Sequence, residues 1–276
     1  MKGQELKRRI TGINETVKIT KAMQMISAAK MHKLQQKYDD AKKYLGRVSD
    51  AVHLVRTALF SLHPYLKGHD GDRSAFIVIA GDKGLCGDYN HLVLEKALEN
   101  IQNSNVTHLF PVGYIARDFF KKKGYNMITT YIHLGLDPMP DEARTITDDI
   151  IQRFVLKEFD NVYIVYTGIK TLSVQNVVVE KLLPLSYTEN ENAVEFLPGE
   201  GSVDNALNHY ILAKMYYALT SSSLAINYKR MIAMQQSTTN GEEIISELKL
   251  QYNHKRQESI TTELVDASAS LQGKRL

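Results

Sequence analysis

Cysteine is nearly absent from this chain of 276 residues, in which Cys86 is the only one. One cysteine excludes an internal disulfide and a cysteine metal cluster, and it is consistent with a reducing compartment. Long hydrophobic runs are missing too. The longest strongly apolar stretch, Ala75 to Ala80, is far too short to cross a bilayer, and the start of the chain lacks the apolar run of a secretory signal. These absences predict a soluble or peripheral protein.

Proline is missing before Pro64, and the first sixty residues contain only three glycines. Counting from Leu6 to Leu62 in alternating steps of four and three residues gives seventeen positions, of which fourteen are apolar or aromatic. This is the heptad pattern of a coiled-coil helix. We expect one helix of about 55 residues, with a rise of about 1.5 Å per residue. It should end before His63, because proline disfavours a helical conformation in the residue that precedes it.

The last third of the chain repeats this pattern. No proline follows Pro198, and apolar heptads recur from Ile211 to Leu271. They predict a second helix of about 70 residues. Two long helices with heptad seams at opposite ends of one chain are natural partners in an antiparallel coiled coil.

The apolar seam lapses in both helices, over 20–27 and over 235–243. In the first lapse the apolar residues move to a neighbouring face, and in the second the seam contains a glycine, which costs about 1 kcal/mol relative to alanine inside a helix. Lapses are expected where a helix pair must loosen, bend or face polar partners. They favour a working shaft over an inert rod.

The middle of the chain alternates strands and short helices, which predicts a parallel-rich, Rossmann-like α/β domain. We expect the domain bounds 1–62, 74–187 and 205–276, with a connection over Thr188 to Asp204. The expected strands are Ser74–Ala80, Thr107–Val112, Asn126–Tyr131, Val162–Thr167 and Val177–Leu185, and the expected helices are Leu92–Ile101, Ile115–Lys123 and Glu142–Phe159.

A glycine-rich turn, GDKGLCG, follows the first of these strands and contains Gly81, Gly84, Cys86 and Gly87. Phosphate-binding loops occupy such places, but the spacing GxxGxxG is neither the dinucleotide fingerprint nor a P-loop. A tight turn that needs glycine dihedrals is the favoured interpretation. For Cys86 a small buried thiol is favoured over a reactive one, because Lys83 is the only nearby cation.

Charge is unevenly distributed along the chain. The net charge is +3, but residues 1–50 hold twelve Lys/Arg and five Asp/Glu, a net of +7, so that the remainder sums to −4. A basic first helix could bind nucleic acid or anionic lipid, complement an acidic partner protein, or form the solvated side of a coiled coil. No aromatic residue precedes Tyr38, which disfavours nucleic acid.

Two rival functions are a nucleotide-binding enzyme that uses the glycine turn and a coiled-coil adaptor that uses the basic helix. The nine histidines show no metal-ligand spacing, so a metal site is not expected. The paired carboxylates, Asp148 with Asp149 and Glu242 with Glu243, lie on predicted helix surfaces. Solvated faces explain them better than acid–base catalysis does.

Three long motifs resemble those of gamma subunits of bacterial F-type ATP synthases. They are ITGINETVKITKAMQMISAAKM from Ile10 to Met31, the glycine turn with the three residues after it, and a C-terminal group. That group contains RMIAM from Arg230 to Met234 and LKLQYNHKRQESITTEL from Leu248 to Leu264. Two departures stand out: AINYK, from Ala225 to Lys229, replaces a stretch that usually carries an acidic residue, and Thr239 replaces an aspartate.

The resemblance implies a central rotor shaft, without catalytic residues or cofactors of its own, in a proton-translocating complex. The two helices would run through a hexamer of alpha and beta subunits, and the α/β domain would contact the epsilon subunit and the c-ring. It implies no nucleic-acid partner and a peripheral location at the cytoplasmic face of the cell membrane. The positions that match hexamer contacts in the family, or lie beside them, are Met23, Lys83, Arg230, Arg256, Gln257 and Thr261.

Overall fold

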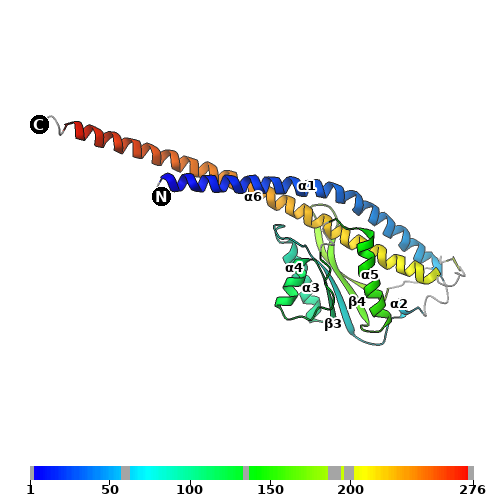
Figure 1. The fold of residues 1–276 in the computed structure, drawn as a ribbon. Coiled ribbons are helices and arrows are strands. Elements are labelled where there is room, and N and C mark those ends of the chain that lie inside the picture. Colours follow the sequence, from blue (N-terminus) through cyan, green and yellow to red (C-terminus); the bar gives the residue numbers. More distant parts are fainter. Residues whose placement is uncertain (1–2, 57–62, 133–136, 186–193, 196–201, 273–276) are drawn as a thin grey trace. The chain divides into compact units, whose positions relative to one another are not determined.

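The computed structural model describes residues 3–56, 63–132, 137–185, 194–195 and 202–272. Two units share these residues: one comprises 1–27 and 231–276, and the other comprises 28–230. Helix α1 (Gly3–Leu54) and helix α6 (Ser202–Gln272) each contribute to both units. We call the first the helical unit and the second the domain unit. The labels of the helices and strands in Figure 1 are used throughout.

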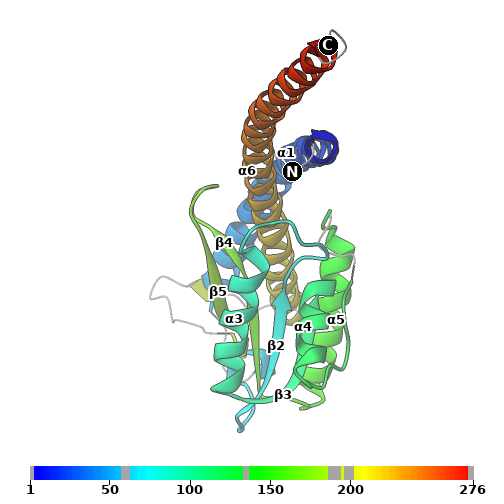
Figure 2. The ribbon, with the colours of Figure 1, turned by 90° about the vertical axis from the view of Figure 1, so that its left-hand side faces the viewer.

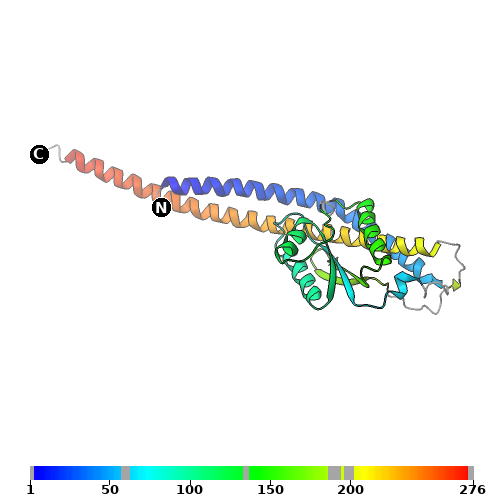
Figure 3. The same cartoon turned by 60° about the horizontal axis from the view of Figure 1, so that its bottom comes forward.

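Helices α1 and α6 pair in an antiparallel sense within each unit, as the heptads predict (Figure 3). In the helical unit, Thr20 is hydrogen bonded to Thr238, and Val17 lies against Gly241. In the domain unit, Tyr38 packs on Tyr217. The α1 heptad positions from Leu6 to Val52 are all buried or half-buried, including the three polar ones in the lapse, so the seam continues through the lapse.

The apolar residues beside that lapse lie outside the seam. Ile19 and Ile26 are 61% and 57% exposed, whereas Ser27 is buried. The α6 seam of the helical unit is filled in turn by Met234, Thr238, Gly241, Ile245 and Leu248, all of them buried. The polar and small residues at the seam positions of both lapses are therefore buried or half-buried, whereas other residues of the second lapse, such as Gln235 and Glu242, are exposed.

The α/β part of the domain unit is built on a four-stranded sheet in the order β3-β2-β4-β5. Strand β2 (Arg73–Ile79) pairs in parallel with β3 (Asn105–Val112) and with β4 (Asn161–Ile169), and β5 (Gln175–Leu183) is antiparallel to β4. Its central strand β2 is an almost continuous apolar run because both of its faces are covered.

Each face of the sheet has its own hydrophobic core. Ala75, Ile77 and Ile79 face α5 (Pro140–Val155) and the first part of α6, whereas Phe76 and Val78 face α3 (Tyr89–Gln102) and α4 (Tyr114–Lys122). In Figure 1 the sheet lies between α3 and α4 on one side and α5 on the other, and Figure 2 views it from the side of α3. The predicted class, an α/β domain with paired terminal helices, is confirmed.

A short helix and a small two-stranded sheet complete the described part of the chain. A short helix, α2 (Pro64–Lys67), follows His63, and Val55–Arg56 (β1) pairs in parallel with Val194–Glu195 (β6). Helix α1 ends at Leu54 and is followed directly by β1, whereas the sequence predicted a helix up to residue 62. Residues 57–62 and most of the connection expected over Thr188–Asp204 lie outside the described residues. The three domain bounds stay a prediction.

Two of the other predicted elements were wrong in part. The segment Asn126–Tyr131 is not a strand, since only Tyr131 pairs, through an isolated bridge to Val112, while Met127 packs against the α3–α4 core. Helix α5 ends at Val155 and not at Phe159. Lys157 has a φ of 58°, which turns the chain, and Phe159 then enters the core fully buried.

Candidate functional site

The glycine turn after β2 is held at both of its ends. The backbone N–H of Gly81 donates to Asn90 Oδ1 at 2.9 Å, and its carbonyl oxygen accepts from the N–H of Ile115 at 3.1 Å. Asp82 Oδ1 accepts from the N–H of Tyr114 at 3.1 Å. The turn is thereby tied to the starts of both α3 and α4.

The three glycines of the turn have different reasons to be there. A Cβ on Gly81 would lie 2.3 Å from Cδ1 of Ile226 on α6, so that glycine permits the close approach of the helix. Gly87 has a φ of 61°, a conformation that side chains disfavour. Gly84 has neither feature, because an added Cβ would meet nothing within 4 Å. The expected need for glycine dihedrals is confirmed at Gly87 alone.

Cys86 is a buried thiol, as expected. Its side chain is 2% exposed and accepts a hydrogen bond from Asn90 Nδ2, with 3.1 Å between nitrogen and sulfur. Burial raises the pKa of the thiol, and the positive charge of Arg230 only partly offsets this. A neutral, buried thiol is a poor nucleophile.

The start of α3 is unsuited to a phosphate group. The residue before the helix is Asp88, whose carboxylate would lie next to any anion bound at the helix N-terminus. Lys229 on α6 already pairs with Asp88, at 3.2 Å. The described residues also include no group of three His, Cys, Asp or Glu side chains that could hold a metal ion.

Arg230 of α6 reaches over the turn and brings two predicted site residues together. Its Nη2 lies 3.3 Å from the carbonyl oxygen of Lys83, and its Nε lies 3.3 Å from the carbonyl oxygen of Gly84. A third nitrogen, Nη1, lies 3.4 Å from Asn227 Oδ1 on its own helix. We call these contacts the Arg230 latch. Lys83, whose carbonyl group is latched, is itself an exposed residue.

The segment from Ala225 to Lys229, which departs from the family motif, contributes to the same contact. Ala225, Ile226 and Asn227 are buried, and Ile226 belongs to the core that the turn covers. Lys229 supplies the ion pair to Asp88. Sequence reasoning missed this pair, because it joins residues 141 positions apart with no shared local pattern.

The remaining predicted site residues belong to the helical unit. Met23 is half-buried on α1, whereas Arg256, Gln257 and Thr261 are exposed on α6. Gln257 and Thr261 are one helical turn apart, and the Thr261 hydroxyl group donates to the Gln257 carbonyl oxygen at 2.9 Å. They line a hollow of about 600 Å³ with His254 and Val265.

Arg256 lies on a different side of α6. It lines a second hollow, of about 620 Å³, together with Gly3, Gln4 and Lys7 of α1. An added Cβ on Gly3, the first residue of α1, would lie 3.9 Å from the ring of Tyr252. Leu264 and Val265, farther along α6, are 66% and 59% exposed. A helix that exposes such side chains offers apolar surface for a partner to cover.

The chain matches the ATP synthase family model over residues 2–272. It is 35% identical over 274 residues to the ATP synthase gamma chain of Halothermothrix orenii, which covers 95% of this chain and 96% of that one. It is also 35% identical over 280 residues to that of Pelotomaculum thermopropionicum, covering 98% and 99% of the two chains. The chain therefore belongs to the ATP synthase family, among its gamma chains.

Solved structures show the same fold. A chain of the Euglena gracilis mitochondrial ATP synthase, in an assembly described as OSCP/F1/c-ring, superposes with a TM-score of 0.69 at 17% identity and covers 98% of this chain and 94% of that one. A chain from the central stalk and c-ring of the Tetrahymena thermophila enzyme gives a TM-score of 0.60 at 20% identity, covering 79% and 98%. None of the described helices is long and apolar enough to span a membrane.

Proposed function

We propose that the chain is the central rotor shaft of a bacterial F-type ATP synthase and catalyses no reaction itself. Ion flow through the c-ring turns the shaft, and the shaft drives the beta subunits of an alpha–beta hexamer through binding, synthesis and release of ATP. The epsilon subunit binds the α/β domain, and the complex lies at the cytoplasmic face of the cell membrane.

The observation that carries this proposal is the packing of α1 against α6 in the helical unit. Gly241 admits Val17 so closely that an added Cβ would lie 2.5 Å from its Cγ2 atom. Close contact between helices stiffens the pair, because it leaves no space for side chains to rearrange. A shaft that transmits torque needs this stiffness, whereas an enzyme does not.

The geometry of the glycine turn supports the absence of catalysis. Cys86 is neutral and buried, and the Asp88 carboxylate would lie next to any anion bound at the start of α3. Exposed and half-buried residues of the two units are instead available for protein contacts. We propose that Met23, Arg256, Gln257 and Thr261 form one set of contacts to the hexamer, and Lys83 with Arg230 another.

The test is reconstitution with alpha and beta subunits. Alone, the purified chain should hydrolyse no ATP. Mixed with the alpha and beta subunits of a gamma-chain relative, it should assemble and yield an active ATPase, and a bead attached to its α/β domain should rotate in one direction. Hydrolysis by the isolated chain, or an ATPase of full activity in which the bead never turns, would contradict the proposal.

A further inference from the structure

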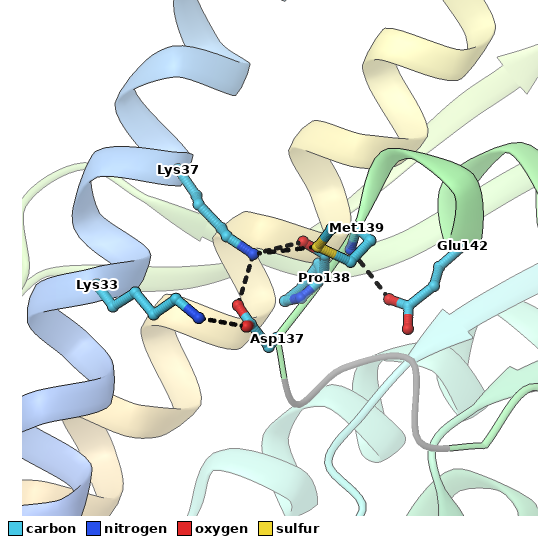
Figure 4. Close-up of polar contacts among 6 residues, drawn as sticks. All are labelled: Lys33, Lys37, Asp137, Pro138, Met139 and Glu142. Carbon is cyan, nitrogen blue, oxygen red and sulfur yellow. Dashed lines mark hydrogen bonds and ion pairs between the residues drawn. The ribbon is translucent and has the colours of Figure 1, made fainter.

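A single carboxylate joins α1 to the segment that precedes α5. Asp137 Oδ2 accepts from Lys33 Nζ at 2.6 Å, and Oδ1 accepts from Lys37 Nζ at 2.6 Å (Figure 4). Lys37 Nζ lies in addition 3.2 Å from the carbonyl oxygen of Pro138 and 3.5 Å from Met139 Sδ. We call Asp137, Lys33 and Lys37 the clasp.

The clasp is anchored on a rigid part of the α/β domain. Pro138 is buried, and the N–H of Met139 donates to Glu142 Oε2 at 3.1 Å, which closes a capping box at the start of α5. Behind it, Ala143 and Ile146 are fully buried in the core shared with α6. A carboxylate fixed to a capped, packed helix start cannot follow α1 if that helix shifts.

A second contact holds the same two turns of α1 from another side. Leu34 and Tyr38 are 2% and 5% exposed, and the Tyr38 hydroxyl donates to the carbonyl oxygen of Ile169 at 3.3 Å. They follow the two clasp lysines by one residue each, which is about 100° around the helix axis. Helix α1 is thus held by α6 and the end of β4 on one face, and by the segment before α5 on the next.

The two contacts hold α1 by different interactions. The packing of Leu34 and Tyr38 opposes separation of α1 from its neighbours, and the Tyr38 hydroxyl group adds a neutral hydrogen bond at 3.3 Å. Charge-assisted hydrogen bonds are shorter and about twice as strong as neutral ones. The clasp therefore adds two short, directional bonds that resist rotation of α1 about its own axis.

The two lysines of the clasp differ in exposure. The side chain of Lys37 is 23% exposed and that of Lys33 is 65% exposed. Their hydrogen bonds lower the pKa of the Asp137 carboxyl group, Lys33 and then Lys37 being the largest causes. The carboxylate, which any ordinary aspartate carries at neutral pH, is thereby kept charged to a lower pH than usual.

We infer that the clasp locks α1 to the α/β domain and carries torque between them. The inference rests on the proposed rotor function, within which Asp137, Lys33 and Lys37 are positioning residues. Torque that enters through the α/β domain can reach α1 through the clasp and through the Tyr38 hydroxyl group, so the loss of the clasp should allow slip under load. Without load, the apolar contact is enough to keep the helix in place.

The experiment compares Asp137→Asn with the native chain in whole complexes in inverted membrane vesicles. ATP hydrolysis and ATP-driven ion uptake are measured against a small and a large opposing ion gradient. Against the small gradient both rates should match the native ones. Against the large gradient, the ions pumped per ATP should fall about two- to fivefold, the range by which one exposed ion pair shifts an equilibrium. Lys33→Gln removes the more exposed of the two ion pairs and should lower the number of ions pumped per ATP by less.

Glu99→Gln is the matched control. It removes the ion pair between Lys96 and Glu99, at 2.8 Å, which is similarly exposed but lies within α3 alone. This variant should pump like the native complex. An exchange of charges, Lys37→Asp with Asp137→Lys and Lys33→Gln, should restore pumping against the large gradient, because it rebuilds one ion pair in the reverse sense.

Native pumping by Asp137→Asn against the large gradient would overturn the inference and leave the rotor function intact. An equal loss in Glu99→Gln, or no recovery in an assembled charge-exchange variant, would overturn it as well. A native complex that hydrolyses ATP without any ion uptake would instead contradict the proposed function.

Discussion

The hydroxyl oxygens of Thr20 and Thr238 lie 2.7 Å apart across the helix pair of the helical unit. Since each hydroxyl group has one hydrogen, one threonine donates across the seam and the other donates to a carbonyl oxygen of its own helix, that of Val17 for Thr20 or that of Met234 for Thr238. The seam thus contains a satisfied polar pair where the heptad pattern lapses. A hydrogen bond at one level of a seam fixes which residues face each other, because any other register leaves it unmade.

Replacing either threonine by valine should cost about 1 kcal/mol of unfolding free energy, the usual net value of one hydrogen bond. Replacing both should cost less than the sum of the two single losses. In the double variant no hydroxyl group remains in the seam that could be left without its partner. Urea unfolding followed by circular dichroism gives the four free energies of the cycle. Strictly additive losses would show that the pair contributes no coupling.

Gly241→Ala tests the close approach of the helices. Alanine gains about 1 kcal/mol of helix propensity over glycine, but overpacking typically costs about 1–3 kcal/mol, so we expect a net loss. Val17→Ala should relieve the crowding and recover part of the stability. Gly12→Ala is the control, since nothing lies within 4 Å of its added Cβ. Thermal unfolding should rank Gly12→Ala above the native chain and Gly241→Ala below it; a stabilised Gly241→Ala would refute the tight packing.

The heptad pattern predicted the helix pair well because the 3.5-residue period is a local property of the sequence. The end of α5 was missed because it is not a local property. The end of α5 depends on the turn at Lys157 and the burial of Phe159, which only the folded core sets. The contacts of the candidate sites are equally non-local, since Arg230 meets Gly84 across 146 residues and Lys33 meets Asp137 across 104. The glycine turn was found because its motif is continuous.

Arg230→Lys should loosen the glycine turn, because an ammonium group cannot reach both latched carbonyl groups as the guanidinium fork does. The positive charge beside Cys86 is retained, so that the change acts through access to the thiol. The reaction rate of Cys86 with a thiol reagent should rise about three- to tenfold. The loss of one hydrogen bond shifts the equilibrium for local opening of the turn by about this factor. Arg256→Lys, on the same helix but in the helical unit, should leave the rate unchanged. A native rate in Arg230→Lys would contradict the latch.

The raised pKa of Cys86 makes stability depend on alkaline pH. Above about pH 8.5, the ordinary pKa of a thiol, the unfolded chain releases a proton that the folded chain retains. The folded state then binds more protons, so this contribution to stability is full below that pH and is lost as the pH rises through the raised pKa. Unfolding midpoints should fall more steeply between pH 8.5 and 10 in the native chain than in Cys86→Ala. Equal slopes would show that the thiol is not linked to folding.

Met23 and Gln257 test the proposed contacts of the helical unit with the hexamer. Met23 is half-buried and Gln257 is exposed, so alanine at Gln257 should change stability by less than about 0.5 kcal/mol, and at Met23 by somewhat more. If these side chains meet the hexamer, their loss should slow ATP synthesis in vesicles about fivefold, as a contact worth about 1 kcal/mol would. Gln251→Ala, also exposed on α6, is the control for surface changes. Melting temperatures within a degree of the native value at Gln257, combined with slowed synthesis, separate coupling from folding. Unchanged synthesis in both variants would contradict the proposed contacts of Met23 and Gln257 with the hexamer.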